Sequence, residues 1–169
     1  GEAVHRVACL LQNKKLFPTE IMRCMYYAHI YPHLTYCNPT WSTTYPCHLS
    51  NLNILNKKMI RIMTNSDFYE HTPPIFKSLK ILQLADIFQF SIAAHMYKTI
   101  KSNPNSTQPH HDYPTSNQYS LRVPPHRLTL LQHSLMYNGL KVWNDIPASI
   151  KDEPNLLSFK KKIKEYILS

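Results

Sequence analysis

Glycine is scarce in this chain and proline is abundant. Two glycines, Gly1 and Gly139, occur in 169 residues, against thirteen prolines. Nucleotide-binding loops need several glycines where the backbone curls against phosphate, so neither a dinucleotide fingerprint nor a P-loop is present in the sequence. Tight hairpins also favour glycine, which argues against an all-β sandwich. The chain therefore favours helices separated by proline-rich joints.

Apolar residues recur at helical spacing through most of the chain. The expected helical segments are Val4–Phe17, Pro18–Ile30, His48–Met63, Leu84–Ile100, Ser134–Asn144 and, after a cap at Asn155, Leu156–Leu168; a short segment, Ile75–Leu79, precedes the long helix at Leu84. Tyr119, Leu121 and Val123 alternate with polar residues and predict one short extended piece, which could pair with Leu128–Leu130. We predict a mainly α fold, a helical bundle of about six helices with at most one small β-hairpin.

The composition changes between residues 102 and 118 to Ser, Asn, Pro, Thr and His, without an apolar period. Such a stretch is typical of a flexible linker. We predict a helical bundle over residues 1–101 and, over 119–169, a short extended segment with two helices that pack on the bundle. In these two helices the apolar stripes carry Met136, Trp143, Phe159 and Tyr166, which are expected to pack inward.

Basic residues outnumber acidic ones: 19 Lys and Arg against 10 Asp and Glu give a formal charge of +9. This balance favours a polyanionic partner, nucleic acid or an anionic membrane surface, over a basic but inert surface. No stretch approaches the roughly 18 apolar residues that span a bilayer. We expect no membrane partner.

The four cysteines are irregularly spaced and form no metal-ligand pair, which predicts reduced thiols and an intracellular location, nuclear or cytoplasmic. The chain opens on Gly1 without an initiator Met, as expected for a piece of a longer protein. His29 and His33 are interrupted by Pro32, which would break a helix carrying them as a pair.

Catalytic patterns are missing from the sequence. The acidic residues are dispersed, and their adjacent pair, Asp152 and Glu153, lies in a proline-flanked turn. No nucleophile elbow is present. We therefore expect no catalytic residue, no metal site, no cofactor and no small-molecule substrate, although a Ser or Cys nucleophile with partners elsewhere in the chain stays open.

Two basic clusters flank apolar helix faces. In the third expected helix, Lys57 and Arg61 lie four residues apart on one side, and Lys58 lies about 100° from Lys57. Each cluster alone fits an ordinary solvated face as well as a phosphate contact, but two clusters with few compensating acids favour contact. The predicted nucleic-acid-binding residues are Lys57, Lys58, Arg61, Lys160, Lys161 and Lys164.

Several short motifs follow one another in an order that resembles a known family. They are Tyr36–Asn38 with Trp41, Leu55–Met63, Asp67–Thr72, Ile81–Ile87, Met96–Lys98, Gly139–Pro147 and Ser158–Lys164. Between about Tyr27 and Leu168 the chain is similar to the region after the polymerase core of non-LTR retrotransposon (LINE-type, jockey-like) reverse transcriptases. Departures include Asn56 where the family usually has Gln and Leu140 where Pro often follows the Gly.

The resemblance implies thumb helices and the region beyond them, which lie beside template RNA and the primer-template duplex. Residues 1–101 would be the thumb-like bundle. The metal-binding Asp motif of the catalytic palm is not in this sequence, so the segment is not an enzyme on its own, and its implied partners are RNA or DNA, through phosphates, and an upstream palm. The alternative is a helical protein-interaction module or domesticated retroelement remnant that binds no nucleic acid; an independent hydrolase is a weaker third interpretation.

Overall fold

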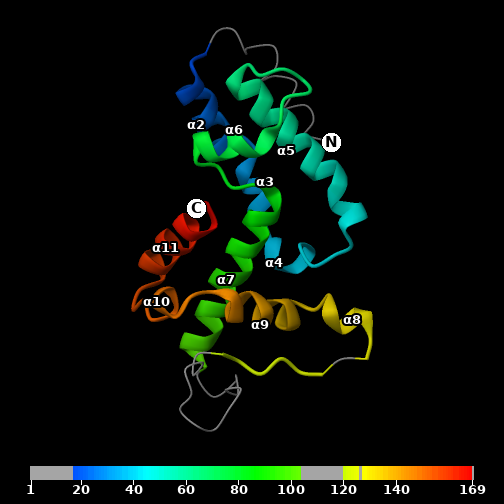
Figure 1. Cartoon of the computed structure of the whole chain (residues 1–169), viewed down its shortest axis with the longest axis vertical. Helices are drawn as coiled ribbons and strands as arrows, with labels where there is room; N and C mark the ends of the chain where they lie inside the picture. Colours follow the sequence, from blue (N-terminus) through cyan, green and yellow to red (C-terminus); the bar gives the residue numbers. More distant parts are fainter. Residues whose placement is uncertain (1–16, 104–119, 126, 169) are drawn as a thin grey trace. The chain divides into compact units, whose positions relative to one another are not determined.

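The computed structural model describes residues 17–103, 120–125 and 127–168 (Figure 1). In these ranges it contains ten helices and no β-sheet, which confirms the mainly α prediction. The helix expected at Val4–Phe17 lies outside the described residues except for Phe17, and so does most of the linker expected at 102–118. The described helices outnumber the six expected because several single-turn helices occupy the joints.

The chain divides into two compact units. The first comprises Gly1–Cys37 and Tyr45–Ile87, and the second Asn38–Thr44 and Phe88–Ser169. Helix α7 (Leu84–Ser102) runs through the boundary between Ile87 and Phe88. The domain limits predicted from composition, 1–101 and 119–169, stay a prediction.

In the first unit, prolines mark where helices begin. This unit contains α2 (Thr19–His29), α3 (Tyr31–Thr35), α5 (Pro46–Thr64) and α6 (Thr72–Leu79). Pro18 is the N-cap of α2, and the other three helices have proline in their first two positions. Proline fits there because its φ is already helical and the missing N–H has no partner within the helix. Pro32, expected only to stop a helix, thus also starts the next.

Helices α2 and α6 both pack on α5. Tyr26 of α2 and Asn56 of α5 are buried, and the Tyr26 hydroxyl donates a hydrogen bond of 3.0 Å to Asn56 Oδ1. Burial raises the pKa of Tyr26 above its ordinary value. On the expected seam of α5, Met59 and Ile62 are buried, which fixes that face of the helix against the core.

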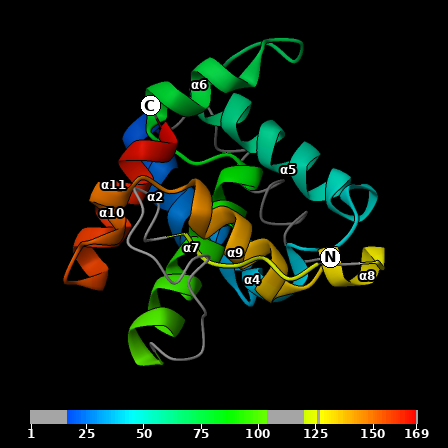
Figure 2. The same ribbon diagram turned by 60° about the horizontal axis from the view of Figure 1, so that its bottom comes forward.

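Among the described residues, the second unit contains helix α7 from Phe88 onward and five further helices, of which α9 lies across α7 (Figure 2). These are α4 (Asn38–Trp41), α8 (Thr129–Gln132), α9 (Leu135–Asp145), α10 (Ala148–Lys151) and α11 (Leu156–Leu168). The cap expected at Asn155 forms, because Asn155 Oδ1 accepts from the Leu157 N–H at 3.2 Å. Helix α9 has an N-cap in Ser134, whose Oγ accepts from the Tyr137 N–H at 3.2 Å.

Stacked aromatic rings form the centre of the second unit. Phe159 of α11 stacks on Tyr97 of α7 with ring centroids 4.4 Å apart, and on Trp143 of α9 at 6.1 Å. The predicted burial of Trp143 and Phe159 is confirmed, with exposed fractions of 5% and 0%. The Tyr97 hydroxyl also donates to the Glu153 carbonyl at 2.6 Å. These contacts join α7, α9 and α11 into one core.

Two side chains expected to pack inward do not. Met136 and Tyr166 are each 47% exposed. Covering elements do reach these turns, because Tyr137 is buried and Leu135 and Ile167 pack against the buried cluster. Met136 and Tyr166 are therefore exposed because other side chains of the same turns occupy the buried face.

The hairpin considered for Tyr119–Leu130 does not form in the described residues. Leu130 lies in helix α8, so it cannot pair as a strand with Leu121. Instead the side chain of Asn144 satisfies both backbone groups of Leu121, accepting from its N–H at 2.8 Å and donating to its carbonyl at 2.9 Å. A side-chain amide thus replaces the expected strand partner.

Candidate nucleic-acid interface

Helix α5 presents three basic side chains and contains no acidic residue. Lys58 is exposed, while Lys57 and Arg61 are half-buried at the margin of the same surface. Buried Met59 and Ile60 hold the opposite side of this turn in the core. The α5 cationic face, defined as Lys57, Lys58 and Arg61, is therefore carried on a helix whose orientation is fixed by packing.

Arg61 also has a structural role that its spacing did not reveal. Its Nε and Nη2 donate to the backbone carbonyl of Glu70 at 3.1 and 2.9 Å, and its guanidinium carbon lies 6.0 Å from the ring centroid of Phe68. A guanidinium has five N–H donors, so these two bonds leave donors for a phosphate. Arg61 connects the α5 cationic face to the segment that follows the helix.

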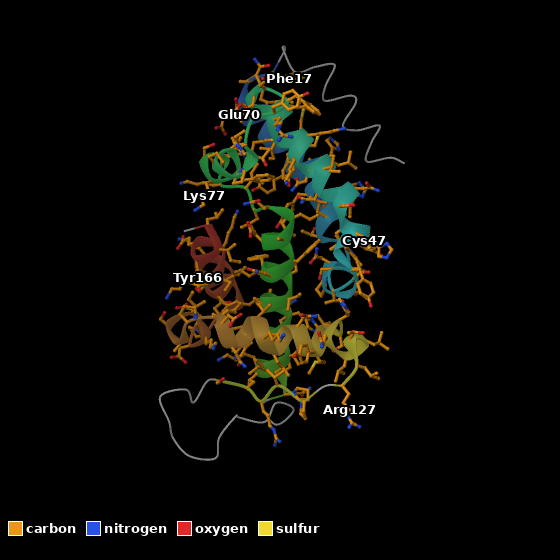
Figure 3. All side chains as sticks on the ribbon, turned by 45° about the vertical axis from the view of Figure 1, so that its right-hand side comes forward. Phe17, Cys47, Glu70, Lys77, Arg127 and Tyr166 are labelled. Atoms are coloured by element: carbon orange, nitrogen blue, oxygen red, sulfur yellow. The ribbon has the colours of Figure 1, made fainter. Side chains whose placement is uncertain are left out.

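That segment, residues 65–71, is a structured loop between α5 and α6; Figure 3 labels Glu70 within it. Asn65 adopts a left-handed conformation with φ of 56°, and the Ser66 N–H bonds back to the Arg61 carbonyl at 3.0 Å, as in a Schellman helix end. Further along, Asp67 Oδ1 accepts from the Phe68 N–H at 2.6 Å. The helix end and the arginine together determine the path of the loop.

Two large aromatic side chains project from the 65–71 loop. Phe68 is 62% exposed and Tyr69 is 85% exposed, and their rings meet edge to face with centroids 5.3 Å apart. From the sequence, these residues are part of the Asp67–Thr72 family motif, and no function was predicted for them. The sequence did contain a signal for them, because two adjacent aromatic residues in a polar turn without an apolar period are expected to be exposed.

Helix α11 carries the second predicted cluster. Lys161 is exposed, and Lys160 and Lys164 are half-buried, while Phe159 and Ile163 anchor the helix in the core. The α11 cationic face, defined as Lys160, Lys161 and Lys164, repeats the i, i+1, i+4 spacing of the α5 face. Lys162 projects from another flank of the helix and pairs there with the Glu153 carboxylate.

The six predicted residues thus form two sets of three, one in each compact unit. Each set shares one face of its own helix. The two helices differ in their acidic residues: α5 has none, and α11 has Glu165.

Other binding chemistry is sparse in the described ranges. No group of three or more His, Cys, Asp or Glu side chains there could hold a metal ion, and Cys24, Cys37 and Cys47 are free thiols on the surface. Within the same residues, no helix combines the length and apolar character needed to traverse a lipid bilayer. No family model, curated protein or solved structure matches the chain.

Proposed function

We propose that this chain is a noncatalytic module that holds RNA or DNA by its phosphates through the α5 and α11 cationic faces. The observation that carries the proposal is the α5 face: three cations on one side of a packed helix that has no carboxylate of its own. Phosphate contact by Lys and Arg supplies most sequence-independent affinity for nucleic acids. A fixed helix keeps these cations together at little entropic cost.

The order of sequence motifs supports a more specific form of this proposal. In that form the chain is the thumb and C-terminal region of a non-LTR retrotransposon reverse transcriptase, an intracellular polymerase of the nucleus or cytoplasm. Its ligands are template RNA and the primer-template duplex, and its protein partner is the palm that precedes it. In this form of the proposal the palm catalyses polymerisation, and this chain binds the nucleic acid through its phosphates.

The salt dependence of binding tests the phosphate contacts. Each lost phosphate contact lowers the slope of log affinity against log salt by about 0.9 on duplex DNA and about 0.7 on single strands. Lys57→Gln with Lys58→Gln should therefore reduce the slope by nearly 2 on a duplex, whereas Arg61 is left intact because it also holds the loop. Replacing Lys160, Lys161 and Lys164 by Gln removes three contacts and should reduce the slope by about 2.7 on a duplex, and base sequence should have little effect.

A matched control removes the same charge elsewhere. Lys98 and Lys101 are exposed lysines on α7, outside both cationic faces. Lys98→Gln with Lys101→Gln should leave the slope nearly unchanged. Equal reductions from the α5 pair and from this control would mean diffuse attraction and would refute a defined site.

A protein-interaction module is the second candidate, and one observation favours it. Apolar side chains at and before the start of α9 are exposed: Leu128, Leu130, Leu131 and Met136. If this were the function, Leu130→Glu with Met136→Glu would abolish partner binding. The α5 lysine variant would leave partner binding unchanged, and neither RNA nor DNA would bind with a measurable salt slope.

A further inference from the structure

We propose that Phe68 and Tyr69 form a base-stacking platform beside the α5 cationic face, which makes the ligand of this face a single strand. The inference rests on the proposed function, because it names the form of nucleic acid that the same face binds. Stacking of unpaired bases on aromatic rings next to a cationic track is the common way in which proteins hold single strands. In a duplex the bases already stack on one another inside the helix, so the rings have little to contact.

The loop displays these rings in a defined geometry. Arg61 donates two hydrogen bonds to the Glu70 carbonyl, and Asp67 accepts from the Phe68 N–H, so the residues on both sides of the pair are anchored. The Glu70 N–H also bonds to the Asp67 carbonyl at 3.2 Å, which closes the turn. Aromatic rings held in this way lose little conformational entropy when a base stacks on them.

The two rings have different roles because their planes are nearly perpendicular, at 88°. Successive bases in a strand are roughly parallel, so both rings cannot stack on neighbouring bases at once. Tyr69 is the more exposed ring and is the stacking surface. Phe68 contacts both the Tyr69 ring and the Arg61 guanidinium, and it supports Tyr69.

The charges around the loop separate base contact from phosphate contact. The loop carries two exposed acidic residues, Asp67 and Glu70, which repel phosphate. The cations lie on α5 instead, at Lys57 and Lys58, with Arg61 joining the two regions. A single strand can place its phosphates along the helix and turn a base onto Tyr69. A peptide partner would gain less from this arrangement, because α5 offers it three like charges.

The test compares a short oligothymidylate with a DNA duplex of equal length on the full chain. Tyr69→Ala should weaken binding of the single strand by about 5- to 140-fold, the range measured for loss of one stacked base. Duplex affinity should change less than about twofold, and the salt slope should stay the same because no charge is removed. Tyr69→Phe keeps the ring and should bind normally.

Tyr36→Ala is the matched control, since Tyr36 is another exposed aromatic of the same unit and lies outside the loop. It should leave both affinities unchanged. Phe68→Ala should weaken single-strand binding less than Tyr69→Ala. Circular dichroism of each variant checks that the helices are intact.

The outcomes separate this inference from the proposed function. If Tyr69→Ala leaves single-strand affinity unchanged while Lys57→Gln with Lys58→Gln still reduces the salt slope, the platform is refuted and the phosphate face stands. Equal losses on single strand and duplex also refute the platform. If the lysine variant leaves the slope unchanged, the proposed function itself fails, whatever Tyr69 does.

Discussion

Replacing Gly139 by alanine would insert a methyl group at a point where α9 contacts α7 closely. A Cβ at this position would lie 2.5 Å from Met96 Sδ and 2.9 Å from Met96 Cγ, well inside van der Waals contact. Met96 is completely buried, so its side chain cannot swing into solvent to make room. Gly139 does not have a positive φ, so the backbone itself would accept alanine.

Two opposing effects set the size of the change. Alanine inside a helix is more favourable than glycine by about 1 kcal/mol. Overpacking a well-filled core costs about 1–3 kcal/mol. The free energy of unfolding should therefore fall by about 0–2 kcal/mol in Gly139→Ala.

A second substitution, at Met96, should reverse the sign of the effect that Gly139→Ala has on stability. Met96→Ala removes the atoms that the new methyl group would meet, although it also lowers stability by creating a cavity. In that background Gly139→Ala should raise the free energy of unfolding by about 1 kcal/mol, because only the helix-propensity gain remains. The coupling energy between the two positions should then be about 1–3 kcal/mol.

Urea denaturation followed by circular dichroism measures all four members of this cycle. We expect Gly139→Ala to lower the free energy of unfolding of the original chain and to raise that of the Met96→Ala chain, with unchanged m-values. If Gly139→Ala stabilises both backgrounds equally, Met96 does not contact this position. The packing of α9 on α7 would then be wrong as described.

The aromatic core and the buried tyrosine give two more predictions. Trp143→Ala and Phe159→Ala should each lower the free energy of unfolding by about 3–5 kcal/mol, and an unchanged thermal midpoint in both would contradict their packing. Tyr26→Phe removes the donor to buried Asn56 and should cost about 1–3 kcal/mol in urea denaturation at neutral pH. Because burial raises the pKa of Tyr26, the contribution of this residue to stability should be constant below about pH 10 and fall above it, and Tyr26→Phe should make the alkaline loss of stability shallower.

The long helices could be predicted because their signals are local. α5 begins at a proline and ends at Asn65, whose left-handed conformation is one that asparagine tolerates. The expected range of residues 48–63 falls within the observed Pro46–Thr64. Periodicity, a start signal and a stop signal agree over this segment, and each depends only on neighbouring residues.

The single-turn helices could not be predicted, because distant contacts stabilise them. α4 (Asn38–Trp41) is too short to be stable alone. Trp41 packs edge to face on Phe88 at 5.1 Å, and the carbonyl of Thr43, just after α4, hydrogen-bonds to His133 Nδ1 at 2.8 Å. The partners are 47 and 90 residues away. The boundary between the two units could not be predicted either, because it lies inside α7 and the helical period of the sequence continues across it.

The candidate site, like the fold, was predicted from the sequence only in part. Charge spacing located the cations of the α5 face, but spacing alone cannot distinguish a solvated arginine from one that bonds to a carbonyl nine residues further along. Arg61→Lys therefore makes a decisive variant, because lysine keeps the charge and loses the planar pair of donors that Glu70 accepts. The salt slope should be unchanged, whereas oligothymidylate affinity should fall toward that of Tyr69→Ala as the loop loosens. A fall in slope without selective loss of single-strand binding would show that Arg61 acts only through its charge.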